Sequence, residues 1–237
     1  LPAPARMTTP TRHLSATGFA TLLLIAFMMG ANHVAARLAF NHGVDVATAV
    51  TFRSAITALV VGVIVAWNRV PIRLTARHKK ALPAIGLLIG VQSLCLYSAV
   101  ARLPVALALL AFNTYPLWTA LWARLFYGHR PERAVLLAMP VMLVGLALAL
   151  DVFGAASGLG AAGQWGRIGA GVAFALTAAA TFGIALVVTQ HEASDLDGRV
   201  RTASTMGIVG LLALAAVTAQ GGPHLPTAAL GWWAWVR

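Results

Sequence analysis

Eight residues that could bind a solute lie inside long apolar stretches of the sequence. In chain order they are Asn32, His33, Arg53, Gln92, Ser93, Asn113, Tyr115 and Pro116. Hydrogen-bonding and ionisable groups are costly in a membrane, so they tend to face a cavity or a partner helix. Arg53 could bind an anionic group, and the amides could orient it. His33 could carry a proton, because its reference pKa is near neutrality.

These residues also have structural interpretations. Arg53 could extend its guanidinium to the lipid headgroups, as Arg37 is expected to do. The amides and Ser93 could join neighbouring helices by hydrogen bonds worth about 0.6 kcal/mol each. His33 could pack as a neutral imidazole, and Pro116 could simply kink its helix and free a carbonyl one turn earlier. Their clustering at similar depth on four separate segments favours the binding interpretation.

The sequence offers few features of an enzyme or of a metal site. The chain has no GxxxxGK[ST], GxSxG or HExxH motif and no carboxylate pair within an apolar segment. A membrane-embedded Ser93–His33 pair is conceivable, but no second motif supports it. The single cysteine, Cys95, lies in an apolar segment, which excludes an intrachain disulfide and a Cys-based metal site. We therefore expect no enzyme, no cofactor and no metal.

The composition indicates a membrane protein. Hydrophobic residues make up 59% of the 237 residues and charged residues only 10%, against roughly 25% in soluble domains. The formal net charge of +11 could attract nucleic acid, but the basic residues sit at the ends of apolar blocks, as in membrane-protein loops. The blocks do not alternate as barrel strands would. The expected fold is all-α, a polytopic transmembrane helix bundle.

Seven apolar blocks have the length of membrane spans. They cover about 17–40, 46–67, 81–100, 105–127, 134–153, 168–189 and 203–219, and 230–236 resembles the start of an eighth. The short connections favour antiparallel neighbours. The spacing of Gly86 and Gly90 predicts a close helix approach. Residues 1–6 precede a candidate start at Met7, and the first block is expected to be retained rather than cleaved.

The basic residues predict the orientation. Most lie in segments that share the side of the N-terminus, such as 69–80, whereas the opposite loops hold only Arg102 and Arg167. The positive-inside rule places the N-terminus in the cytoplasm. Sliding the chain on itself brings Gly18 onto Gly171 and Gly30 onto Gly183. The implied repeat has five spans, so its second copy would be inverted, an arrangement common in secondary transporters.

Three segments resemble a known family, the EamA-type members of the drug/metabolite transporter superfamily. FMMGANHVAARLAF at 27–40 resembles the opening W-G-x-N-F-x-x-x-K/R pattern, and TFRSAITAL at 51–59 is similar to the second-helix stretch centred on an Arg. LYSAVARLPVALALLAFNTYPLWTALWARLFYGHRP at 96–131 resembles the Pro- and Ala-rich segment of the third and fourth helices. The likeness is close over 17–153 and looser over 168–236.

The resemblance implies two inverted five-helix halves with both termini cytoplasmic. It divides the chain into a cytoplasmic tail (1–16), a first repeat (17–153), a linker (154–167) and a second, C-terminally truncated repeat (168–237). Asn32, Arg53 and Pro116 match pattern positions of the family. Two positions depart from it: Met29 stands where Trp is common, and His129 replaces the Glu of a Gly-Glu pair.

The function implied is secondary transport of a small polar or amphipathic, amino-acid-like metabolite by alternating access. Export across the cytoplasmic membrane of a bacterium is the expected direction. The partners are then a small-molecule substrate and the lipid bilayer. A coupling proton or ion and a homodimer stay open, and no nucleic acid is expected. The alternative is a non-transporting bundle or a channel subunit.

Overall fold

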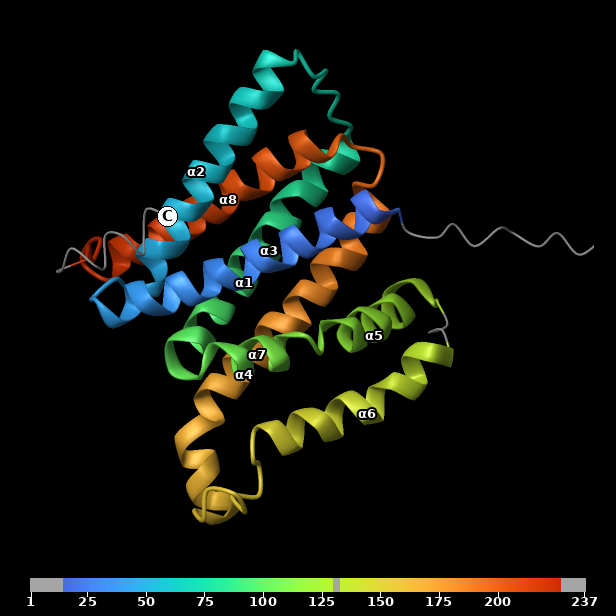
Figure 1. The fold of residues 1–237 in the computed structure, drawn as a ribbon. Coiled ribbons are helices and arrows are strands. Elements are labelled where there is room, and N and C mark those ends of the chain that lie inside the picture. The colour runs from blue at the N-terminus through green and yellow to red at the C-terminus, as the bar shows by residue number, and fades with distance from the viewer. Residues whose placement is uncertain (1–14, 130–132, 227–237) are drawn as a thin grey trace, which may run out of the picture.

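The structure, a computed structural model, describes residues 15–129 and 133–226, and every regular element in these ranges is a helix. The helices are α1 (Ala16–Asn41), α2 (Val46–Trp67), α3 (Ala76–Arg102), α4 (Val105–Phe112), α5 (Tyr115–Tyr127), α6 (Arg133–Ala149), α7 (Gly160–Glu192) and α8 (Gly198–Ala219). Figure 1 shows them as a layered bundle. The predicted all-α membrane fold is confirmed.

Within the described residues, six stretches are long and apolar enough to cross a membrane. Helices α1, α2, α3, α7 and α8 are five of these stretches, and α4 with α5 forms the sixth, Val105–Tyr127. The fifth block expected from the sequence corresponds to α6, which has 17 residues, the lower limit for spanning. The expected start of an eighth span, 230–236, lies outside the described residues.

Helices α3, α7 and α8 begin earlier than the apolar blocks, and polar residues cap two of them, α3 and α8. Thr75 accepts a hydrogen bond from the backbone N–H of His78 and begins α3 ahead of the apolar block. Asp197 does the same for α8 through the N–H of Arg199. Helix α7 begins at Gly160, inside the linker predicted at 154–167. The connection between α6 and α7 is therefore shorter than the linker expected from the sequence.

The predicted fourth span is two helices rather than one. It breaks at Asn113 and Thr114, where the Thr114 hydroxyl donates to the carbonyl of Ala111 at 2.8 Å. Pro116 then sits in the first turn of α5, where a missing backbone N–H costs nothing. The proline therefore starts a new helix at this point, which is why the span does not continue as one kinked helix.

Helices from the two ends of the chain interleave. Helix α3 packs against both α7 and α8, while α2 runs along α8 (Figure 1). Helices α4 and α5 lie on α7. The main neighbours of α2 and α3 are thus distant in sequence. Helix α1 packs on α3 and α4 and is otherwise exposed.

Glycines allow the closest helix contacts. A Cβ atom on Gly86 would lie 2.7 Å from Cβ of Ile208, and one on Gly90 would lie 2.6 Å from Cδ2 of Leu212. Real Cβ atoms do not approach this closely, so a side chain at position 86 would have to displace Cβ of Ile208, whereas one at position 90 would meet the flexible end of Leu212. The prediction from the small-residue spacing is confirmed.

We expect Gly86→Ala to lower the free energy of unfolding by about 1–3 kcal/mol, because the added methyl group overpacks the α3–α8 contact. Thermal unfolding in detergent measures this. Gly62→Ala in α2 is the matched control, since no atom lies within 4 Å of its added Cβ. Equal thermal stability of the two variants would contradict the assigned packing.

Candidate functional site

A polar cluster forms around the buried side chain of Tyr97 on α3. The amide of Asn32 on α1 donates to the Tyr97 hydroxyl at 3.0 Å. The guanidinium carbon of Arg53 on α2 lies over the Tyr97 ring, 5.2 Å from its centroid, within cation–π range. The ring of His33 lies 5.6 Å from the same ring, between centroids. One aromatic side chain thus joins residues of three helices.

Arg53 is held by neutral groups of α3. Its Nη2 donates to Oγ of Ser93 at 3.1 Å, and Ser93 donates in turn to Oε1 of Gln92 at 3.4 Å. Both Gln92 and Ser93 are buried. Among the described residues, no carboxylate pairs with Arg53. The positive charge of Arg53 is therefore not neutralised by a fixed acid in that part of the chain.

Two nitrogen atoms of the cluster are buried without a hydrogen-bond partner. They are Nδ1 of His33 and Nε of Arg53. His33 is 7% exposed. Buried polar atoms are almost always paired, so an unpaired one asks for an explanation such as a bound group. These two atoms belong to the two basic side chains at the Tyr97 ring, and they give the cluster free capacity to bind.

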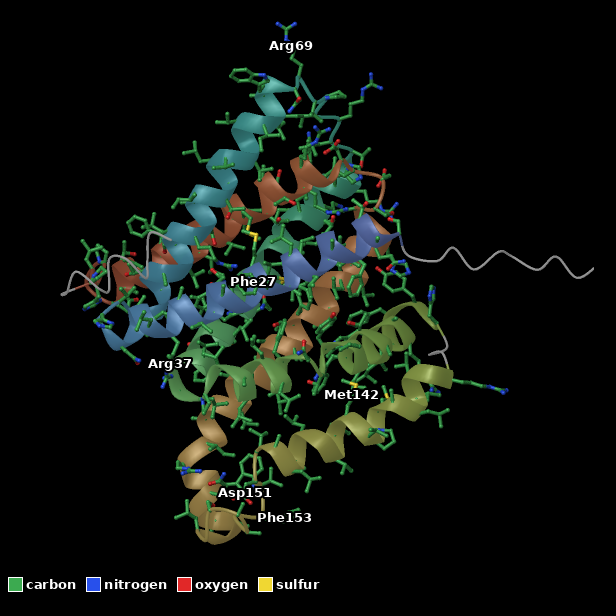
Figure 2. The ribbon with its side chains drawn as sticks, in the orientation of Figure 1. Phe27, Arg37, Arg69, Met142, Asp151 and Phe153 are labelled. Atoms are coloured by element: carbon green, nitrogen blue, oxygen red, sulfur yellow. The ribbon has the colours of Figure 1, made fainter. Side chains whose placement is uncertain are left out.

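Arg37 bonds to α3, and the expected extension of its guanidinium to the lipid headgroups stays a prediction. Its Nη1 donates to the carbonyl of Val100 at 2.6 Å, one of the carbonyls in the last turn of α3 that lack a partner within the helix. Figure 2 labels this side chain at the end of α1. Arg37 therefore joins α1 to α3 one turn beyond the Tyr97 cluster.

The other three residues inferred from the sequence lie elsewhere, at the break between α4 and α5. Asn113 is exposed there, and Pro116 begins α5. The ring of Tyr115 lies 5.1 Å from that of Phe182 on α7, between centroids. The structure thus brings together Asn32, His33, Arg53, Gln92 and Ser93, and it places Asn113, Tyr115 and Pro116 in a separate, mainly aromatic group.

Tyr97 was missed by the sequence reasoning. It follows Ser93 by one helical turn, so the two share a face of α3. The four-residue spacing from Ser93 to Tyr97 was the signal that could have identified Tyr97. Trp122 was also missed. Its indole N–H donates to the carbonyl of Ala180 at 3.1 Å and fixes α5 on α7.

A second polar group lies at one end of the bundle. This end holds the α2–α3 connection, the last turn of α5 and the α7–α8 connection. Glu192 accepts from Nε of Arg77 at 2.7 Å and from the hydroxyl of Tyr127 at 3.2 Å. The ring of His191 stacks on Tyr127 with centroids 3.7 Å apart. We call Arg77, Tyr127, His191 and Glu192 the end cluster. It links α3, α5 and α7 across the face of the bundle.

The buried ring of His78 extends this face to the α7–α8 connection. Nε2 of His78 lies 3.0 Å from Oδ1 of Asp195. This hydrogen bond, with a smaller contribution from the Asp195 backbone, holds the pKa of the Asp195 carboxyl below its usual value. The contact therefore loses strength as the pH falls through that lowered pKa, where the carboxylate becomes protonated.

The opposite face of the bundle is also tied by polar contacts. Asp45 caps α2 through the backbone N–H of Thr48 at 3.1 Å. The backbone N–H of His224, beyond α8, donates to the Thr48 hydroxyl at 3.2 Å. Asp151 and Phe153 mark the connection from α6 to α7 (Figure 2). The α1–α2 connection and the end of α8 thus meet on one side of the bundle.

Apolar spanning helices around a partly buried polar cluster define a polytopic membrane protein. The chain belongs to the EamA-like transporter family, whose model matches residues 16–150. That match covers more than half of the chain and contains all eight residues inferred from the sequence. No curated protein and no solved structure matches the chain.

We expect the Asn32–Tyr97 hydrogen bond to stabilise the α1–α3 contact by about 0.6 kcal/mol, and by no more than about 1.7 kcal/mol. A double-mutant cycle of Asn32→Ala with Tyr97→Phe, measured by unfolding in detergent, gives this coupling energy. Pairing Tyr97→Phe with Thr181→Ala is the control, because the Thr181 hydroxyl bonds only within α7. Equal coupling in both cycles would refute the contact.

Proposed function

We propose that the protein is a secondary carrier that moves a small polar or amphipathic metabolite across a bacterial cytoplasmic membrane by alternating access. The observation that carries this proposal is Arg53, held over Tyr97 by Ser93 within the span of α2 and lacking an acidic partner among the described residues. A charge kept at this depth is expensive unless it has a task. Binding the anionic group of a substrate is the task that its free Nε supports.

The arrangement of the helices supports alternating access. The Tyr97 cluster belongs to α1, α2 and α3, and α2 and α3 pack on α7 and α8. The proposed inverted repeat would make α7 and α8 the counterparts of α1 and α2. Substrate sites of such carriers lie where the two repeats meet, and rocking of one repeat against the other exposes the site to each side in turn.

The orientation is part of the proposal. The α2–α3 and α7–α8 connections meet at one face, which the end cluster closes. Arg69, Arg73, Arg77, Lys79 and Lys80 gather in the first of these connections and in the start of α3. The positive-inside rule makes this face and the N-terminus cytoplasmic. With the end cluster formed, the site is closed to the cytoplasm, and an exporter would open this face to load.

Arg53→Ala should abolish saturable uptake in proteoliposomes of the full-length protein, a loss of at least about 100-fold, because an interaction of about 3 kcal/mol with the substrate anion is removed. Arg53→Lys should retain part of the activity, because lysine keeps the positive charge but lacks the planar set of donors of a guanidinium. The control is Arg102→Ala, since Arg102 bonds only to the Ser98 carbonyl and contacts Phe174.

Unchanged uptake in Arg53→Ala would end the assignment of Arg53 as the anion anchor. The same assay separates a carrier from the alternative of a channel subunit. A carrier gives saturable flux with solute specificity, whereas an ion current that does not saturate would favour the channel.

Glu192→Gln should open the end-cluster face more often, because it removes the Arg77 ion pair. Exposed pairs contribute about 0–1 kcal/mol, so the open population should rise by up to about fivefold. The reporter is Leu196→Cys in a Cys95→Ala background, since Leu196 is buried beneath this face among Val65, Leu82 and Val200. A membrane-impermeant thiol reagent measures its labelling rate.

Asp197→Asn is the matched control for this measurement. The Asp197 carboxylate pairs with Arg199 at the start of α8, so this pair does not join separate helices. A labelling rate in Glu192→Gln equal to that in the control would show that the Arg77–Glu192 pair does not hold the face closed.

A further inference from the structure

The cluster around Tyr97 contains two basic side chains and no acid. Arg53 and His33 both lie against the Tyr97 ring, and each has a buried nitrogen without a hydrogen-bond partner. The six acidic residues of the whole chain are Asp45, Glu132, Asp151, Glu192, Asp195 and Asp197. The five that the structure describes all lie at helix ends or in connections. The chemistry of the cluster is therefore that of an anion site with a titratable neighbour.

We propose that His33 binds a coupled proton together with the substrate, and that the substrate is an organic monocarboxylate without an ammonium group. This inference rests on the proposed carrier function and deepens it. The carboxylate accepts from Nε–H of Arg53. The proton adds to the unpartnered imidazole nitrogen of His33, which then donates to the same carboxylate. On release at the other face, carboxylate and proton leave together.

The coupling follows from the charges. With Arg53 unpaired, a second positive charge on His33 is disfavoured by repulsion in a medium of low dielectric constant. A bound carboxylate neutralises Arg53 and attracts the imidazolium, so it raises the affinity of His33 for a proton. By linkage, protonation of His33 raises the affinity for the carboxylate by the same factor. Neither ligand needs to change the fold for this coupling to operate.

The described elements around His33 supply no acidic side chain. Helix α2 contributes Arg53, α3 contributes Tyr97, and α4 has no titratable side chain in its sequence VALALLAF. On α1 itself the nearest charged residue is Arg37, which keeps its positive charge while it donates to the neutral Val100 carbonyl. The fixed charges near His33 are therefore positive, and a bound carboxylate is the group that would favour its protonation.

Because the cluster around Tyr97 has no acid, it also disfavours zwitterionic substrates such as amino acids. An ammonium group is paired in low-dielectric sites by a carboxylate or by several oxygen acceptors. Here Oε1 of Gln92 already accepts from Ser93, and the Tyr97 hydroxyl accepts from Asn32. A 2-oxo acid and the amino acid with the same carbon skeleton are therefore distinguished by this site, with the 2-oxo acid preferred.

The experiment uses proteoliposomes of the full-length protein with labelled 4-methyl-2-oxopentanoate and labelled leucine as probes. A pH-sensitive dye in the lumen records proton entry. The expected result for the unmodified protein is saturable uptake of the 2-oxo acid, with about one proton per carboxylate and at least about tenfold preference over leucine. In His33→Gln the number of protons per carboxylate should fall at least about fivefold. Arg102→Ala should keep the ratio.

A measurement on the unmodified protein covers the case in which His33→Gln does not fold. The external concentration for half-maximal uptake should rise with pH between 5 and 8, by up to about tenfold per unit, because deprotonation of His33 weakens carboxylate binding. The 2-oxo acid stays ionised over this range, so a change in affinity reports the protein.

Saturable uptake that moves no protons, or half-saturation independent of pH, would overturn the proton-coupling inference and leave the carrier function standing. A preference for leucine would overturn the assigned substrate class. If neither probe shows saturable uptake, both this inference and the proposed function fail.

Discussion

The close approach of α3 to α7 and α8 is the constraint on which the other features depend. Gly86 and Gly90 bring α3 against Ile208 and Leu212 of α8. Leu103, just after α3, packs where any side chain on Gly171 of α7 would lie. Because lipid offers helices little hydrophobic drive to associate, such tight packing supplies much of the association energy. With α3 fixed in this way, its Ser93 and Tyr97 become the support for Arg53.

The Tyr97 cluster shows how a guanidinium is kept within a helix bundle without an acid. A cation–π contact and one hydrogen bond from Nη2 hold Arg53 in place, and neither removes its net charge. A buried ion pair would have satisfied the side chain and left nothing for a ligand. The neutral support is therefore compatible with binding, and the free Nε of Arg53 and Nδ1 of His33 are the atoms available for it.

The sequence predicted the membrane-helix fold because hydropathy and span length depend on local composition alone. It also predicted the glycine contact of α3 and five of the residues that meet at Tyr97. It failed where polar capping, proline placement or distant packing decides the outcome. Helix α3 begins ahead of its apolar block because Thr75 caps it, and the fourth span breaks ahead of Pro116. The α2–α8 neighbourhood joins residues too far apart for any local pattern to indicate.

The charge of Arg53 also has an electrical consequence for a carrier. Arg53 is the eighth residue of α2, about 11 Å along the helix axis from its start, and so lies within the membrane field. If it crosses part of that field when the empty protein reorients, each full elementary charge moved changes the free energy by about 2.3 kcal/mol per 100 mV. A bound carboxylate cancels this charge, and the proton on His33 restores it, so the empty and the loaded cluster carry the same net charge. The membrane potential would then act on both reorientation steps alike, and the net cycle, which moves one carboxylate with one proton, would be electroneutral.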